Sequence, residues 1–308
     1  MTGRRVYLVT GASSGIGFEA TRTLLRRGHV VYGAARRTQL MAPLVEAGGH
    51  ALRMDVTDAD SVAGAVSTIV GEQGRIDGVV ADAGYAQLGT IENVTIDDAM
   101  RQFDVNVLGV TRVVQAVLPT MRAQGRGTIV VVSSIAARTA VPGMVWYAAS
   151  KHALEAFADA LRMEVGRFGI RVAIVQPDFA RTGLLEASLP TLDAAGRAPH
   201  AGVYEREQAH FRARFRDSVL RGTPAEEVGR VVAEALERDA PKRRYAPTIV
   251  ARLKLLLMRH LGDGLLDRIL GRMWLGKGSH GQAPAGRATS RLAGVDVGSD
   301  RGDRPPSG

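Results

Sequence analysis

The chain has 308 residues, and the 45% of them that are hydrophobic are enough to form a sizeable globular core. It contains no cysteine, so disulfides, thiolate metal sites and a cysteine nucleophile are excluded, and its seven histidines lack a metal-ligand spacing such as His-Glu-x-x-His. Nearly all of the +9 net charge lies in residues 242–308, which hold 13 Lys/Arg and 5 Asp/Glu. The basic charge lies in a tail without interleaved aromatic residues, so we do not expect nucleic acid as a partner. The missing metal-ligand spacing likewise argues against a bound metal.

Short apolar runs rich in Val and Ile alternate with helical patterns up to residue 176. Runs without strict polar–apolar alternation are typical of strands buried on both faces, and strand–helix alternation predicts a parallel sheet covered on both sides. The expected fold class is therefore α/β, a doubly wound Rossmann-type sheet. The strands are expected at Arg5–Thr10, Val30–Ala34, Ala51–Asp55, Gly78–Ala81, Thr128–Ser133 and Arg171–Gln176, and the helices at about Gly15–Arg27, Thr38–Ala47, Asp58–Gln73, Ile96–Gln124 and Ala149–Phe168.

The pattern loosens after Gln176. Residues 183–222 are interrupted by Pro and Gly and are interpreted as a substrate loop with one charged helical stretch near Glu205–Val219. Thr223-Pro224-Ala225-Glu226 is typical of a capping box with proline at the first helical position, so a helix is expected to follow as far as about Arg238. Arg244–Ala246 predicts one more short strand. We therefore expect a single domain over residues 1–240, an amphipathic basic helical extension over 241–276, and a disordered tail over 277–308.

A glycine-rich turn follows the first expected strand and opens the first helix. Glycine permits a tight turn and close backbone approach to a phosphate, and the N-terminus of the next helix offers free N–H groups and the positive end of its dipole. The turn therefore predicts a site for the pyrophosphate of a dinucleotide. Its residues are Thr10-Gly11-Ala12-Ser13-Ser14-Gly15-Ile16-Gly17.

The spacing of this turn, Thr-Gly-x-x-x-Gly-x-Gly, resembles that of the short-chain dehydrogenase/reductase family. Further motifs match the family in order and spacing over residues 4–240, and the C-terminal stretch is similar to that of hydroxysteroid- and retinol-dehydrogenase-like members. The matching motifs are Asp55-Val56 after the third strand, Asp82-Ala83-Gly84 after the fourth, Asn106 in Asn-Val-Leu-Gly, Ser134 after the fifth strand, Tyr147-Ala148-Ala149-Ser150-Lys151, Pro177 and Thr182.

The resemblance implies four catalytic residues. Tyr147 is the expected acid/base, Ser134 positions the substrate oxygen, Lys151 holds the nicotinamide ribose, and Asn106 relays protons through water. The residue spacing agrees, because side chains four apart share a helix face. A nearby ammonium is expected to lower the pKa of a tyrosine from about 10 towards the range useful for acid/base work.

NADP(H) is the cofactor that the end of the second strand predicts. Ala35 stands where NAD-binding sheets carry a carboxylate for the ribose 2′-hydroxyl, and Arg36 follows, where an arginine accommodates a 2′-phosphate. Arg37 is expected to assist. By the resemblance, the cofactor-binding set comprises Gly11, Ser13, Ser14, Gly15, Ile16, Gly17, Arg36, Arg37, Asp55, Val56, Asp82, Ala83, Gly84, Tyr147, Lys151, Pro177 and Thr182.

Two residues depart from the family pattern. Asp82 replaces the usual asparagine and loses an amide donor, and Asp178 replaces the glycine of the family's Pro-Gly turn, which puts a side chain near the nicotinamide site. A non-catalytic NADP(H)-binding regulator on the same fold is therefore one alternative. All four catalytic positions are filled, which favours an active enzyme.

The resemblance implies an NADP(H)-dependent oxidoreductase that interconverts an alcohol and a ketone or aldehyde on a lipophilic substrate, such as a steroid, a retinoid or a long-chain carbonyl compound. Leu184, Leu185, Leu189 and Phe179 suggest an apolar pocket mouth. A 3-oxoacyl thioester reductase is the alternative within the family, and the long C-terminal extension speaks against it. Family members commonly form dimers or tetramers, so a homo-oligomer is expected.

The segment 249–275 combines leucines, arginines and Trp274. A basic amphipathic helix with tryptophan can lie in a membrane interface, so peripheral membrane contact is one hypothesis. The favoured interpretation is that the same segment covers the substrate pocket or packs at a dimer interface. No signal peptide and no run of about 18 uncharged apolar residues stand out, so we expect a cytoplasmic protein, with membrane association through 249–275 as the hypothesis to test.

Overall fold

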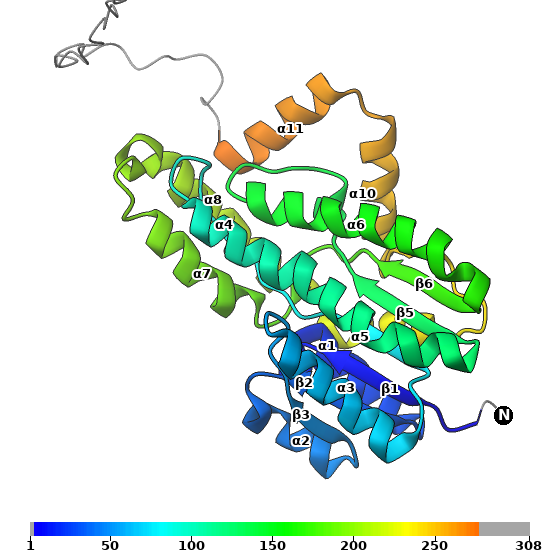
Figure 1. Cartoon of the computed structure of the whole chain (residues 1–308). Coiled ribbons are helices and arrows are strands. Elements are labelled where there is room, and N and C mark those ends of the chain that lie inside the picture. The colour runs from blue at the N-terminus through cyan, green and yellow to red at the C-terminus, as the bar shows by residue number, and fades with distance from the viewer. Residues whose placement is uncertain (1–2, 277–308) are drawn as a thin grey trace, which may run out of the picture.

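A seven-stranded parallel sheet, in the order β3-β2-β1-β4-β5-β6-β9, forms the centre of the molecule (Figure 1). The computed structural model describes residues 3–276 and confirms the doubly wound α/β class. β1, β2, β4 and β5 are buried at every position, which explains why their sequences lack polar–apolar alternation. The strands are β1 Val6–Thr10, β2 Val30–Ala35, β3 His50–Arg53, β4 Gly78–Ala81, β5 Gly127–Val132, β6 Ile170–Val175 and β9 Arg244–Tyr245.

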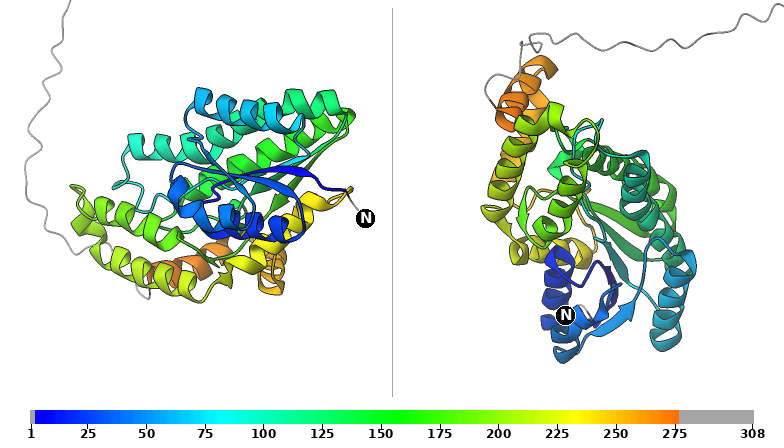
Figure 2. Two further views of the ribbon diagram at one scale, coloured as in Figure 1. Left: turned by 90° about the horizontal axis from the view of Figure 1, so that it is seen from below. Right: turned by 90° about the vertical axis from the view of Figure 1, so that its left-hand side faces the viewer.

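Helices cover both faces of the sheet, as the side view in Figure 2 shows. α3 (Ala59–Gln73), α5 (Gly109–Gln124) and α6 (Val145–Val165) pack on one face through one apolar cluster. α1 (Gly15–Arg26), α2 (Ala42–Glu46) and α9 (Ala225–Glu237) pack on the other face through a second cluster. The strand order reverses between β1 and β4, and in such sheets ligands bind beyond the carboxyl ends of the strands at this switch point.

The helix predicted over Ile96–Gln124 is interrupted by a π-helical turn. α4 (Ile96–Phe103) runs into the π segment Asp104–Leu108, which leads into α5. Such π turns occur frequently at functional sites, and this one contains Asn106, which is fully buried. The wider turn could not be predicted, because its residues fit a regular helix.

Two helix boundaries differ from the prediction. α6 begins at Val145 rather than at Ala149, so Tyr147 lies in the first helical turn. The predicted capping box is wrong: Thr223–Pro224 forms the short strand β8, which pairs with β7 (Ala180–Arg181), and Pro224 caps α9 without a side-chain hydrogen bond. The Thr223 N–H instead donates to the carbonyl of Phe179 at 2.9 Å, a partner that lies far away in sequence.

The segment predicted as a loop, residues 183–222, contains two helices. α7 (Leu184–Ala195) includes Pro190, and α8 (Glu205–Leu220) follows the short 3-10 turn Ala201–Tyr204. Together with α11 (Asp263–Leu275), they enclose a third apolar cluster, and we call α7, α8 and α11 the helical lobe. The charged stretch folds as a helix because Phe211, Phe215 and Val219 recur at spacing four and are all buried.

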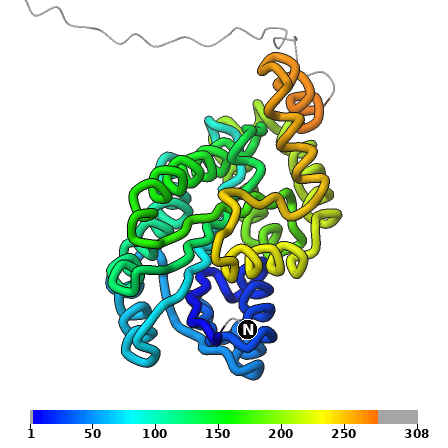
Figure 3. Tube along the Cα trace, turned by 90° about the vertical axis from the view of Figure 1, so that its right-hand side faces the viewer, coloured from blue at the N-terminus to red at the C-terminus, as the bar shows by residue number. Residues whose placement is uncertain are grey.

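The C-terminal helices, α10 (Ile249–His260) and α11, lie at the end of the molecule remote from the N-terminus (Figure 3). The chain breaks between them at Leu261–Gly262. Within residues 3–276, no helix is long and apolar enough to cross a membrane. The predicted disordered tail, 277–308, lies outside the described residues.

Candidate active site

The glycine-rich turn between β1 and α1 admits no side chain at its tightest points. Gly11 and Gly15 adopt φ angles of 73° and 60°, which side chains rarely tolerate. A Cβ on Gly17 would lie 2.8 Å from the carbonyl oxygen of Gly11 and 2.9 Å from Oδ2 of Asp82. The turn therefore has the compact backbone that close approach of a pyrophosphate requires, with Ser13 and Ile16 partly exposed beside it.

Asp82 joins this turn to the end of β4. Its Oδ2 accepts the Gly17 N–H at 2.8 Å. The carboxylate that replaces the family's asparagine therefore binds the first turn of α1. The Thr10 hydroxyl accepts the N–H groups of Asp82 and Ala83, both at 3.1 Å. Burial raises the pKa of Asp82 to about 7, although the Lys151 ammonium and the Gly17 N–H oppose this rise. Thr10 belongs to the predicted turn but was not among the predicted cofactor-binding residues. Its position directly before the first glycine was the sequence feature that could have indicated its role.

The segment after β6 passes beside the glycine-rich turn. A Cβ on Gly15 would lie 3.0 Å from Cβ of Thr182, and a Cβ on Gly183 would lie 3.6 Å from Oγ of Ser14. Pro177 is buried at the start of this segment. The structure thus brings Ser14, Gly15 and Thr182 together from distant parts of the sequence, as the cofactor prediction requires.

The predicted adenine-side residues follow β2 and β3. Arg36 and Arg37 are exposed directly after β2, and the charge of Arg36 helps to lower the pKa of Asp55, whose carboxylate also accepts hydrogen bonds from Thr57. Val56 is buried against α5, where a Cβ on Gly109 would approach its side chain to 2.7 Å. An exposed cation therefore stands beside the carboxyl ends of β2 and β3.

The four predicted catalytic residues lie on neighbouring elements. Lys151 donates from Nζ to the carbonyl of Val132 at 2.9 Å, and this ammonium lies 5.8 Å from the ring centroid of Tyr147. Ser134 follows β5, and its hydroxyl is close enough to Tyr147 to lower the pKa of the phenol. Asn106 donates from Nδ2 to the Ser150 hydroxyl at 3.1 Å, which links the π turn to α6.

Asn106 also organises the loop after β4. Its Oδ1 accepts the Tyr85 N–H at 3.1 Å, and its Nδ2 donates to the Tyr85 carbonyl at 3.0 Å. A Cβ on Gly84 would lie 3.0 Å from Oδ1 of Asn106, so glycine allows this close contact. The amide is thereby fixed beside the loop that carries Asp82 and Ala83.

The Tyr147 pKa was expected to be lowered, but in the structure of the protein alone it is raised. Burial raises the pKa of Tyr147 to about 12, the Asp82 carboxylate raises it further, and only the hydrogen bond with Ser134 lowers it. Burial also lowers the pKa of Lys151 to about 8, against the attraction of Asp82 and Glu155. Desolvation outweighs the lysine charge because the charged forms of both side chains lose water in this site.

Glu155 is a residue that the sequence analysis missed. It lies one turn after Lys151 on α6, and its carboxylate accepts hydrogen bonds from Gln176 at 3.0 Å and from Arg244 at 2.9 Å. The i,i+4 spacing from Lys151 was the available signal. Glu155 thus connects the helix that carries Tyr147 to the ends of β6 and β9.

An apolar cavity opens next to the start of α6. Its volume is about 380 Å³, and Gly143 and Val145, on either side of Met144, contribute to its wall. Tyr147 packs against the apolar cluster of the helical lobe, which contains Met144, Leu192, Phe211 and Trp274. The remaining cavity walls come from the loop after β4, the helical lobe and its 3-10 turn: Gly89, Thr90, Ile91, Pro142, Leu192, Val203, Tyr204, Glu207, Gln208, Phe211 and Leu275.

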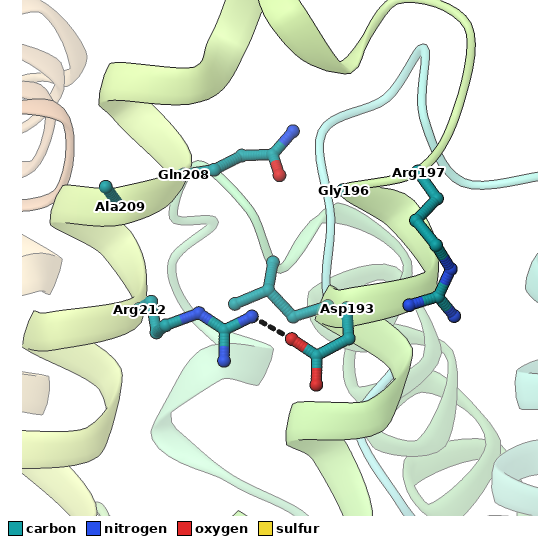
Figure 4. A pocket seen from close by; sticks show the side chains of 7 residues that line it. Asp193, Gly196, Arg197, Gln208, Ala209 and Arg212 are labelled. Atoms are coloured by element: carbon teal, nitrogen blue, oxygen red, sulfur yellow. Dashed lines mark hydrogen bonds and ion pairs between the residues drawn. The ribbon is translucent and has the colours of Figure 1, made fainter.

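A second cavity, of about 400 Å³, lies between α7 and α8 (Figure 4). Asp193 and Arg212 form an ion pair across it, and Gln208 and Arg197 also line it. None of the four predicted catalytic residues lines either cavity, and the cavity next to α6 is the one that borders the helix carrying Tyr147.

Similarity to known proteins assigns the family. The family model for short chain dehydrogenase matches residues 5–192, more than half of the chain. The chain belongs to the short-chain dehydrogenase family. The uncharacterized oxidoreductase YbbO of Escherichia coli (strain K12) is 30% identical over 268 residues, covering 87% of this chain and 94% of the relative.

Two further proteins resemble this short-chain dehydrogenase. The 3-ketodihydrosphingosine reductase of Bacteroides thetaiotaomicron is 38% identical over 182 residues, which cover 59% of this chain and 66% of the relative, just under two thirds. A solved structure of a short-chain dehydrogenase from Streptomyces avermitilis is 30% identical with a TM-score of 0.69, covering 87% of this chain and 94% of that chain. This short-chain dehydrogenase thus shares its family with proteins named as oxidoreductases and reductases.

Proposed function

We propose that this short-chain dehydrogenase uses NADP(H) to interconvert an alcohol and a ketone or aldehyde on a lipophilic substrate, a steroid, retinoid or long-chain carbonyl compound. Tyr147 is the acid/base. The observation that most supports this proposal is the grouping of Tyr147 with the Ser134 hydroxyl and the Lys151 ammonium.

The proton steps follow from this grouping. In reduction, the Tyr147 hydroxyl gives its proton to the carbonyl oxygen while the Ser134 hydroxyl holds that oxygen in place. The bound cofactor supplies the hydride for the carbonyl carbon in this direction and accepts it in alcohol oxidation. Lys151 keeps a positive charge near the resulting tyrosinate, and Asn106 connects the site to Ser150 and the loop after β4. Proton supply and oxygen positioning are thus assigned to separate side chains.

Arg36 carries the proposed preference for NADP(H). It is exposed after β2, and an arginine in this place matches a ribose 2′-phosphate. Arg36→Ala is expected to raise the Kd for NADPH about tenfold and to leave the Kd for NADH unchanged. Arg171→Ala, on an exposed strand position, is the control. Equal effects on both nucleotides would contradict the assignment.

The lipophilic substrate class is supported by the apolar surroundings of Tyr147. Tyr147 packs against the apolar cluster of the helical lobe, and the neighbouring cavity beside α6 is also lined mainly by hydrocarbon side chains. Apolar pockets with few polar groups favour apolar ligands. Acyl thioesters are the competing substrates, and turnover of a 3-oxoacyl thioester in preference to long-chain aldehydes would favour the alternative reductase.

The outer surface of the C-terminal helices supports reversible contact with an anionic membrane. Ile249, Leu253, Leu256 and Leu257 of α10 are each more than half exposed, and exposed arginines lie among them. Sedimentation with anionic vesicles, but not with neutral ones, is the expected result. The homo-oligomer expected by resemblance is the competing use of this surface, and light scattering of wild type and Leu253→Glu tests it.

The central test follows nicotinamide absorbance with a panel of steroid, retinoid, aliphatic and thioester substrates. Tyr147→Phe is expected to lose at least about a thousandfold in kcat while still binding NADPH. Tyr245→Phe, on the edge strand β9, is the matched control. Turnover that survives Tyr147→Phe would refute the mechanism, and NADPH binding without turnover of any substrate would favour the non-catalytic regulator.

A further inference from the structure

The C-terminal helices contact two adjacent residues in the segment that follows β6. Lys254 of α10 forms an ion pair with Asp178, whose side chain is only 11% exposed. Trp274 of α11 is buried and packs against Phe179, with ring centroids 5.9 Å apart. One dipeptide, Asp178-Phe179, is therefore contacted by both C-terminal helices.

This dipeptide lies between the two sides of the proposed site. It follows Pro177, whose carbonyl accepts the N–H of Ile135, the residue after Ser134, at 2.9 Å. It precedes Thr182, which lies against Gly15 of the glycine-rich turn. α10 also packs against the 3-10 turn Ile135–Ala137. A displacement of α10 would therefore disturb both the segment next to Ser134 and the segment that leads to Thr182.

The departure from the family pattern at Asp178 makes the contact with α10 necessary. A largely buried carboxylate is costly unless a positive charge compensates it. Its Oδ1 has no hydrogen-bond partner among residues 3–276, and the ion pair to Lys254 is made by Oδ2. Lys254 therefore supplies the compensating charge, and it comes from outside the region that the family model matches.

Trp274 completes the second contact. Its ring lies 5.5 Å from that of Phe211, and Phe179 meets Phe215 edge-on at 5.9 Å. We call these four rings the aromatic cluster. It forms part of the apolar cluster against which Tyr147 packs.

We propose that Lys254 and Trp274 are specificity-determining residues, which act through Asp178 and Phe179 to fix the C-terminal helices as one wall of the substrate pocket. Bulky lipophilic substrates bind against this wall, whereas small carbonyl compounds do not need it. The kinetic part of this inference rests on the proposed function.

The test compares Lys254→Gln with Arg259→Gln in the full-length protein. Both changes remove one positive charge from α10, but Arg259 is exposed and makes no ion pair within the described residues. We expect Lys254→Gln to speed hydrogen–deuterium exchange in residues 249–260 and 177–182 about tenfold. It should also raise the KM for a long-chain aldehyde about five- to tenfold. The kcat for that aldehyde and the KM for propanal should each change less than about twofold. Arg259→Gln should do neither.

Two further variants separate positioning from general damage. Lys254→Arg keeps the ion pair and should restore both exchange and KM to near wild-type values. Trp274→Phe keeps a ring in the aromatic cluster and should raise the long-chain KM less than Trp274→Ala does.

The inference would be overturned if Lys254→Gln had the same hydrogen–deuterium exchange rates and the same long-chain KM as Arg259→Gln. It would also be overturned if Lys254→Arg did not restore both quantities. These outcomes leave the proposed function standing. Absence of turnover in the wild type would instead overturn the proposed function and the specificity role together. The exchange data would then still decide whether the dipeptide holds the C-terminal helices.

Discussion

Replacing Gly17 by alanine tests whether the glycine-rich turn binds the cofactor as argued. The added Cβ would lie 2.8 Å from the Gly11 carbonyl oxygen and 2.9 Å from Oδ2 of Asp82. Ordinary contacts begin near 3.4 Å, so both atoms must move by about half an ångström. The Gly11 carbonyl cannot move freely, because Gly11 itself packs against the backbone of Ala83.

The cost can be estimated from overpacking in cores, about 1–3 kcal/mol. For a chain of this size we therefore expect the Tm to fall by about 2–10 °C. The effect on cofactor binding should be larger than this loss suggests, because Gly17 lies at the helix N-terminus that faces the pyrophosphate. We expect the Kd for NADPH to rise at least about a hundredfold.

The matched control is Gly64→Ala in the middle of α3. A Cβ there meets no atom within 4 Å, so alanine should stabilise the helix by about 0.5–1 kcal/mol. Thermal unfolding and titration of NADPH fluorescence measure both variants. An unchanged Kd in Gly17→Ala, at temperatures where it is folded, would refute the assignment of the turn to the pyrophosphate.

Two other perturbations probe the end of β4. Asp82→Asn removes a carboxylate that raises the pKa of Tyr147, so this pKa should fall. Because alcohol oxidation needs the tyrosinate as base, the ascending limb of its pH profile should move to lower pH by about half to one unit. The shift should act mainly above pH 7, where Asp82 is ionised, and an unmoved or upward-shifted limb would contradict it. Thr10→Ala removes the hydroxyl that accepts the N–H groups of Asp82 and Ala83. The free energy of unfolding measured in urea should therefore fall by about 1–3 kcal/mol. A loss below about 0.5 kcal/mol would show that other acceptors replace the hydroxyl.

The sequence alone was sufficient for features that depend on neighbouring residues. Valine-rich strands predicted the parallel sheet, because a strand buried on both faces needs apolar side chains in both directions. The glycine turn was visible because Gly11 and Gly15 occupy conformations that few other residues adopt. The spacing of Tyr147 and Lys151 placed both side chains on one helix, although the start of that helix was predicted four residues late.

Predictions from local sequence patterns were wrong where residues distant in the sequence bind the same backbone groups. Thr223 was predicted to cap a helix, but its N–H donates to Phe179 in the short β7–β8 pairing. The π turn around Asn106 and helix α7 were missed as well, whereas α8 (Glu205–Leu220) agrees with the helical stretch predicted near Glu205–Val219. Leu192 of α7 becomes buried only when the helical lobe closes on itself.

Only the tertiary structure decided the electrostatics of the site. The lysine charge near Tyr147 was foreseen from the spacing, but the direction of the Tyr147 pKa was not, because burial depends on every element packed around the ring. Likewise, the sequence showed Asp82 and Asp178 as departures without showing their partners. Gly17 lies 65 residues from Asp82 and Lys254 lies 76 residues from Asp178, and separations of this kind are closed by the fold, not by any local pattern.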